Sequence, residues 1–193
     1  PLLRVFEQAG KHETARRVRT LCSRIFRFAV ATDRCENDPT AVLTGALAAP
    51  PPGEFAAVTD REQIGGLMRA IRGYAGDPTT VTALRVLAYT GLRPGEVRSL
   101  LWSDVDWSEA LISIPAQRMK MRRDHLVPMS RQVVEALTAL QPWTGDGALV
   151  FPSMRAAGRP LSENTLNAAL RRMGYASHEA TSHGFRKTFS TLL

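Results

Sequence analysis

Cysteine is scarce in this sequence, and long apolar runs are missing. The 193 residues include only Cys22 and Cys35, which are too few for a disulfide framework and lack the paired spacing of a zinc site. No stretch reaches the roughly 18 consecutive apolar residues that a transmembrane helix needs. The first residues do not form a signal-peptide pattern. We therefore expect a reducing, cytoplasmic setting and no membrane partner.

The motifs of nucleotide-driven and metal-dependent enzymes are also missing. There is no glycine-rich phosphate loop and no Gly-x-Ser-x-Gly nucleophile motif. The histidines have no metal-ligand spacing among themselves, and the carboxylates do not cluster for magnesium. Asp104 and Asp106 lie close in sequence, but a surface turn explains them. These absences argue against metal-dependent nucleases and nucleotide-driven enzymes.

The composition is that of a folded protein with a basic surface. Hydrophobic residues make up 44% and charged residues 22% of the chain, which excludes a disordered tail. The net charge is +7 with histidine neutral, and the pI is about 10.2. Such a charge indicates a nucleic-acid partner, although a basic surface without such a partner remains an alternative on charge alone.

Three consecutive prolines mark the clearest boundary in the chain. Pro50 to Pro52 cannot continue a helix and favour an extended backbone. We predict a helical DNA-binding part over residues 1–47, a proline-rich linker over 48–58 and a larger domain over 59–193. The chain starts without Met and stops inside an apolar, helix-like stretch, so we expect a fragment of a longer protein.

The first part contains a helical pattern over about residues 13–32. One side is apolar, and the opposite side carries arginines with no acidic residue between Ala15 and Ala31. We expect this arginine face to contact DNA phosphates, with a solvated face as the alternative. The expected apolar positions are Val18, Leu21, Cys22, Ile25, Phe26 and Ala29. The arginine face comprises Arg16, Arg17, Arg24 and Arg27.

The larger part reads as mainly helical with a small antiparallel sheet, an α+β fold. Helices are expected after a capping pattern over residues 59–62, from Pro78 to a glycine cap at Gly91, and from Pro94. Further helices are expected after Ser130, near Ser162 and near Ser182. Residues 111–115 and 125–129 predict two strands joined by a basic turn.

Three places in this part suit phosphate chemistry. Arg93 follows a glycine cap at a helix start, where an anion is favoured. Lys120 lies in the basic turn, where a hairpin tip can approach a phosphate. His183 and Arg186 are three residues apart and would share a helix face. Each place alone also has an ordinary explanation. Arg93 fits a surface arginine paired with Glu96, and Lys120 fits a solvated loop. The His-x-x-Arg spacing also occurs often by chance.

Weaker candidates for phosphate contact surround these places. The basic turn also carries Arg118, Arg122 and Arg123, and the expected helix start at Ser162 follows Arg159.

The patterns, taken in order, resemble the tyrosine recombinase (phage integrase) family, and most closely prophage integrases of the satellite-phage type. The resemblance covers nearly the whole chain, including the end of the family's helical core-binding domain over residues 14–39. It rests on four stretches of the catalytic domain, which are Thr90-Gly-Leu-Arg-Pro-Gly-Glu-Val-Arg98, Arg118-Met-Lys-Met-Arg122 with His125-Leu-Val-Pro-Met-Ser-Arg131, residues 161–172, and His183-Gly-Phe-Arg-Lys-Thr-Phe-Ser-Thr191.

The resemblance implies catalytic roles for Arg93, Lys120, His183 and Arg186, with Glu96 supporting Arg93. It implies site-specific recombination of double-stranded DNA at attachment sites, as in prophage integration. The reaction would pass through a 3′-phosphotyrosyl intermediate on tetramers assembled on DNA, with neither metal nor ATP.

The sequence departs from the family pattern at the nucleophile. The family's tyrosine and its second histidine or tryptophan follow the His-x-x-Arg pair, whereas Tyr74, Tyr89 and Tyr175 all precede His183. We therefore expect these 193 residues to bind DNA without cleaving it. A non-catalytic DNA-binding relative, a type IB topoisomerase and a helical transcription regulator remain alternatives.

Overall fold

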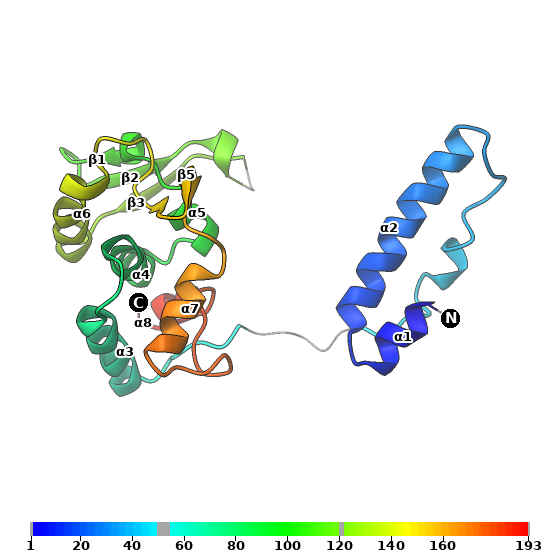
Figure 1. Cartoon of the computed structure of the whole chain (residues 1–193), viewed down its shortest axis with the longest axis horizontal. Helices are drawn as coiled ribbons and strands as arrows, with labels where there is room; N and C mark the ends of the chain where they lie inside the picture. The colour runs from blue at the N-terminus through cyan, green and yellow to red at the C-terminus, as the bar shows by residue number, and fades with distance from the viewer. Residues whose placement is uncertain (1, 50–54, 120–121, 193) are drawn as a thin grey trace. The chain divides into compact units, whose positions relative to one another are not determined.

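The computed structural model describes residues 2–49, 55–119 and 122–192 of the chain. It divides into two compact units, Pro1–Glu54 and Phe55–Leu193 (Figure 1). Lys120 lies outside the described residues. No helix within these ranges has the length and the apolar character needed to cross a membrane.

The first unit is a pair of helices followed by an irregular segment. α1 (Leu2–Gln8) packs against α2 (His12–Ala31), and a short 3-10 helix η1 (Ala41–Leu43) follows. The sequence predicted α2 to within one residue at each end, and that prediction is confirmed.

The apolar side of α2 is only partly covered by the rest of the first unit. Val18, Cys22 and Phe26 are half-buried, facing α1 and residues 40–47. Leu21 and Ile25 remain 56% and 59% exposed. These two residues are exposed because α1 and residues 40–47 cover only part of the apolar side of α2.

Asp38 fastens the turn after α2 back onto the helix. Its carboxylate accepts hydrogen bonds from the Ser23 hydroxyl (2.6 Å) and from the Thr40 hydroxyl (2.7 Å) and N–H (2.8 Å). The Ser23 and Thr40 hydrogen bonds hold the pKa of Asp38 below its ordinary value, because they favour the ionised form.

The second unit is built around one buried helix, α4 (Pro78–Thr90). This helix packs against the other five α-helices of the unit (Figure 1). Leu84, Val86 and Leu87 have no solvent exposure, which fits a helix that is covered on several sides. The other helices are α3 (Arg61–Gly73), α5 (Pro94–Arg98), α6 (Arg131–Thr144), α7 (Thr165–Arg172) and α8 (Phe185–Leu192).

A three-stranded antiparallel sheet lies beside these helices in the order β1-β2-β3. Its strands are β1 (Val105–Asp106), β2 (Leu111–Ile114) and β3 (His125–Pro128). β2 alternates buried Ile112 and Ile114 with exposed Ser113, and Ile112 pairs with Val127. The sequence predicted β2 and β3, and both are confirmed. It missed β1, which is only two residues long.

A second small sheet joins β4 (Pro152–Ser153) to β5 (Ala156–Pro160). No strand was predicted over these residues. Pro152 pairs with Pro160. Proline has no backbone N–H to donate to a neighbouring strand, so a sequence rich in proline does not predict a sheet here. The fold class is nevertheless the predicted one, mainly helical with small antiparallel sheets.

Helix starts follow side-chain caps, with small shifts from the predicted positions. Asp60, rather than Thr59, caps α3 through the Gln63 N–H (2.9 Å). Ser130 caps α6, as predicted. The predicted stop of α4 is also confirmed, since Gly91 follows it in the left-handed region at φ +60°.

Gly184 packs directly against the backbone of Ala56, and a Cβ on this residue would overlap the Ala56 carbonyl oxygen. Gly184→Ala must therefore push the backbone of residues 55–57 away. We expect the free energy of unfolding to fall by about 1–3 kcal/mol. Chemical denaturation followed by circular dichroism measures this change.

The matched control is Gly73→Ala, at the exposed end of α3, where a Cβ meets nothing within 4 Å. We expect this change to be neutral or slightly stabilising. Equal stability of the two variants would contradict the close approach of Ala56 to Gly184.

Candidate functional site

A cavity of about 540 Å³ opens between α5, α7 and the turn before α8. Its charged lining combines three arginines with two glutamates. The lining side chains with charge or titratable character are Arg93, Glu96, Arg98, Arg118, Glu163 and His183.

Arg93 stands immediately before α5 and is held there by Glu96. The Glu96 carboxylate accepts hydrogen bonds from the Arg93 N–H (2.8 Å) and from the Arg93 guanidinium (2.7 Å). The Glu96 side chain is 10% exposed and that of Arg93 is 42% exposed. The carboxylate therefore fixes one edge of a guanidinium that stays accessible from the cavity.

Arg186 on α8 is not among the described residues that line the cavity, but it bonds the backbone just before Arg93. Its Nη1 donates a hydrogen bond to the Gly91 carbonyl (2.8 Å), two residues before Arg93. The missing side chain of Gly91 also leaves room for Phe189 of α8, since a Cβ there would lie 2.6 Å from the Phe189 ring. The structure thereby joins the end of α4, Arg93 and Arg186, which are distant in sequence.

His183 lines the cavity, but it does not lie on a helix as the sequence predicted. α8 begins at Phe185, and the Gly184 N–H bonds the Thr181 carbonyl (3.0 Å), closing a turn that carries His183. His183 and Arg186 therefore do not share a helix face.

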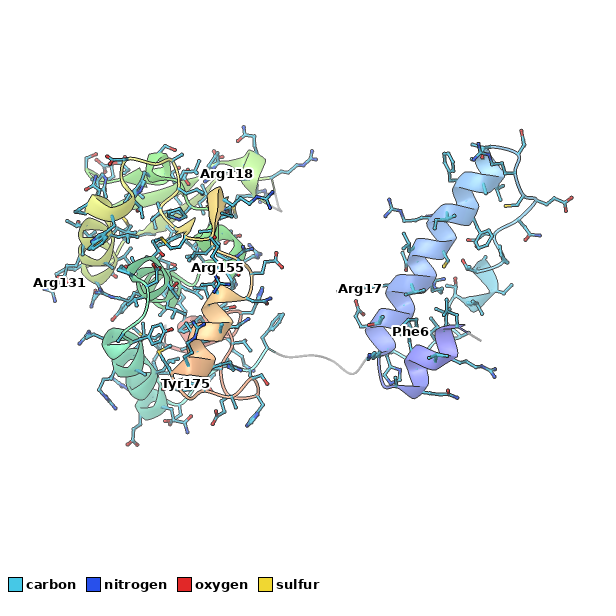
Figure 2. All side chains as sticks on the ribbon, viewed as in Figure 1. Phe6, Arg17, Arg118, Arg131, Arg155 and Tyr175 are labelled. Carbon is cyan, nitrogen blue, oxygen red and sulfur yellow. The ribbon has the colours of Figure 1, made fainter. Side chains whose placement is uncertain are left out.

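Arg118 contributes to the cavity while it is tied down by a carboxylate. It forms an ion pair with Asp104 and lies 3.4 Å from the Ser99 carbonyl. Asp104 is buried at 6% exposure, so its assignment to a surface turn was wrong. The buried partner explains why this residue of the basic turn is fixed in place (Figure 2).

Arg122 and Arg123, also in the basic turn, are not among the described residues that line the cavity. Arg122 and Arg123 are exposed, and Arg122 borders a separate hollow with Ala116 and Met119. The Asp124 carboxylate accepts a hydrogen bond from the Ala116 N–H (2.7 Å) across the base of the hairpin.

The weaker candidates before α7 also lie outside the cavity lining. Ser162 shares a hydrogen bond with the Thr165 hydroxyl (2.9 Å), and Arg159 is exposed on β5. α7 begins at Thr165 and not near Ser162 as predicted. Glu163, Asn164 and Asn167 line the cavity instead.

Two polar residues that sequence reasoning did not select organise the cavity walls. Arg98 donates to the Leu161 carbonyl (2.6 Å) and pairs with Glu163 (3.3 Å). Asn167 accepts from the Ser182 N–H (2.8 Å) beside His183. The partners of Arg98 lie more than 60 residues away, so its spacing carried no signal.

The arginine face of α2 is exposed on the first unit. Arg16, Arg17 and Arg24 border one shallow hollow, and Arg17 pairs with Glu13 at 2.8 Å (Figure 2). Arg27 is exposed as well. Within the described ranges, no group of three His, Cys, Asp or Glu side chains is placed to hold a metal ion.

Two family models together cover both units. Residues 57–193 match the phage integrase family, and residues 1–46 match the phage integrase central domain. The chain belongs to the phage integrase family. This membership confirms the resemblance to tyrosine recombinases that the sequence motifs indicated.

Curated relatives in this family include prophage integrases of Escherichia coli (strain K12). IntS is 36% identical over 193 residues, which span 100% of this chain and 50% of IntS. IntZ is 42% identical over 181 residues, spanning 94% of this chain and 44% of IntZ. The integrase of enterobacteria phage P4 is 33% identical over 193 residues, spanning 93% of this chain and 44% of the P4 integrase. The chain thus spans about half the length of these relatives.

Solved structures of integrases on DNA share the fold. A lambda integrase dimer bound to a COC′ core site matches with a TM-score of 0.69 at 19% identity, covering 98% of this chain and 54% of that one. The Tn1549 transposon integrase with circular intermediate DNA matches with a TM-score of 0.68 at 17% identity, covering 97% and 68%. A lambda integrase tetramer bound to a Holliday junction matches with a TM-score of 0.69 at 19% identity, covering 98% of this chain and 56% of that one.

The Arg93–Glu96 pair generates a second prediction. Glu96→Ala removes the acceptor of both the Arg93 N–H and the Arg93 guanidinium. We expect a loss of about 1–3 kcal/mol in the free energy of unfolding, because a nearly buried hydrogen-bond set is broken. Urea denaturation of the 193-residue chain measures the change.

The control is Glu135→Ala, which removes an exposed Arg–Glu pair on α6 at 3.7 Å. Its expected cost is below about 0.5 kcal/mol. If Glu96→Ala were as mild as Glu135→Ala, the proposed anchoring of Arg93 would be wrong.

Proposed function

We propose that this chain serves site-specific DNA recombination, as part of an integrase that inserts a prophage or related mobile element. The observation that carries the proposal is the convergence of Arg93 and His183 on one cavity, with Arg186 bonded beside Arg93. Two guanidinium groups and an imidazole suit a DNA phosphodiester, because all three can donate hydrogen bonds to phosphoryl oxygens.

The three groups would act on the scissile phosphate. Negative charge builds on the non-bridging oxygens as a nucleophile approaches phosphorus. Donors that are already in position stabilise this charge without reorganising. Glu96 holds Arg93 in that arrangement, while the Gly91 carbonyl holds Arg186. Removing one such donor should slow the chemical step about 10²–10³-fold.

The complete step follows the family chemistry. A tyrosine oxygen attacks phosphorus, the bond from phosphorus to the 5′-oxygen breaks, and a 3′-phosphotyrosyl linkage forms. We assign protonation of the leaving 5′-oxygen to Lys120, which stands at the family's hairpin lysine position. Attack by a second DNA 5′-hydroxyl reverses the step and releases the tyrosine.

None of the tyrosines in these 193 residues is proposed as that nucleophile. Tyr74, Tyr89 and Tyr175 do not line the cavity. Burial raises the pKa of Tyr175, with the nearby Glu179 charge adding to the effect, and this disfavours the phenolate. We propose that the 193-residue chain binds DNA and does not cleave it.

Double-stranded DNA is the proposed partner of both units. We assign phosphate contacts to the exposed arginine face of α2, and further contacts to Arg118, Arg122, Arg123, Arg159 and Ser162. By analogy with the lambda integrase tetramer on a Holliday junction, we propose assembly of the natural protein as a tetramer on DNA. The proposed compartment is the bacterial cytoplasm, where the chromosomal target lies.

A covalent-adduct assay tests the proposed chemistry. The natural protein at full length is mixed with nicked suicide DNA that carries its candidate site, and the mixture is denatured in SDS. We expect a covalent DNA adduct that Arg93→Ala and Arg186→Ala each reduce at least about 100-fold. The control Arg131→Ala, on an exposed α6 pair, should leave the adduct unchanged.

The 193-residue chain should form no adduct in the same assay, although it binds the site. Tight, salt-sensitive binding by the full-length protein without any adduct would favour a non-catalytic DNA-binding relative. An adduct that survives Arg93→Ala would remove Arg93 from the catalytic set.

A salt titration tests the arginine face of α2. Arg24→Ala with Arg27→Ala should flatten the dependence of log binding constant on log salt by about one unit for each lost contact. The control Arg72→Ala with Arg131→Ala removes the same charge from exposed positions on α3 and α6. An unchanged slope for the α2 double variant would mean that these arginines face solvent and make no phosphate contact.

A further inference from the structure

Phe55 stacks on the imidazole of His183. The two ring centroids are 4.4 Å apart, and the ring planes differ by 18°. Phe55 is nevertheless 60% exposed, so it is not a core residue that happens to touch a histidine. The imidazole on which Phe55 stacks belongs to a residue that lines the cavity between α5 and α7.

The backbone after Phe55 is fastened to the turn that carries His183. The Ala56 carbonyl accepts hydrogen bonds from the Thr181 N–H (3.1 Å) and hydroxyl (3.0 Å). The Val58 carbonyl accepts from the buried Thr188 hydroxyl (2.7 Å) on α8. Gly184 leaves room for this backbone, as described above. The position of Phe55 is therefore set by bonds on both sides of His183.

We propose that Phe55 is a positioning residue for His183, an inference that rests on the proposed recombination chemistry. His183 lies in an exposed turn, where its ring would otherwise rotate among several orientations. An aromatic face stacked on the imidazole selects one ring plane and shields that face from water. The free edge of the ring then stays directed to donate to a phosphoryl oxygen.

The surroundings of His183 make this restraint useful. The cavity also holds Arg93, Arg98 and Arg118 as cations, and Glu96 and Glu163 as anions, and these groups attract or repel the imidazole. Among the described hydrogen bonds, none is made by an imidazole nitrogen of His183. The stacking contact with Phe55 is therefore what holds the His183 ring in one orientation.

The first arm of the test is spectroscopic and needs no catalysis. In the 193-residue chain, the ring-current shift of the His183 carbon-bound protons reports the stack directly. We expect these protons to lie upfield, and to move downfield in Phe55→Leu. Phe55→Trp should restore the upfield position. Unmoved proton shifts in Phe55→Leu would overturn the stack itself.

The second arm measures single-turnover cleavage of suicide DNA by the full-length protein. We expect Phe55→Leu to slow adduct formation about three- to tenfold with DNA affinity unchanged, since aromatic stacking contributes modestly. Phe55→Trp should restore the rate. The control Trp143→Leu replaces an exposed aromatic residue on α6 and should cleave at the original rate.

The outcomes separate this inference from the proposed function. If the unaltered protein forms no adduct, the recombination chemistry fails, whereas the proton shifts still report the stack. If Phe55→Leu loses the stack but keeps the full cleavage rate, the positioning role is wrong. A loss of rate that Phe55→Trp does not rescue, with both variants folded by circular dichroism, also overturns it.

Discussion

The end of α4 is the constraint on which the cavity depends. Gly91 takes a left-handed backbone conformation there, and its missing side chain leaves space for the Phe189 ring of α8. Its carbonyl receives the Arg186 guanidinium, and Arg93 follows two residues later. The end of a buried helix thus receives the Arg186 guanidinium and lies directly before Arg93. The hydrophobic core and the charged site are consequences of the same helix end.

The cavity is assembled from segments that are far apart in the chain. Arg98 on α5 bonds the backbone before α7, and Asn167 on α7 bonds the backbone before His183. Each of these links satisfies a backbone group and also places a wall of the cavity. The pattern is that of a site whose geometry is supported by side chains that need not touch a substrate.

The sequence was sufficient for the features that local chemistry determines. The glycine cap of α4, the Ser130 cap of α6 and the alternation in β2 each follow from residues within a few positions of one another. It failed where distant partners decide. The Asp104–Arg118 pair, the start of α8 at Phe185 and the Phe55–His183 stack depend on tertiary contacts that no local pattern encodes. The motif His183-Gly-Phe-Arg186 was visible, but the reason for its glycine was not, because Ala56 supplies that reason from 128 positions earlier.

The anchoring of residues 56–58 has a mechanical consequence. Phe55 is the first residue of the second unit, and the backbone that follows it is held by hydrogen bonds from Thr181 and Thr188, on either side of His183. Any displacement of residues 55–58 must therefore strain these three hydrogen bonds and the stacked rings, and so disturb the turn that carries His183.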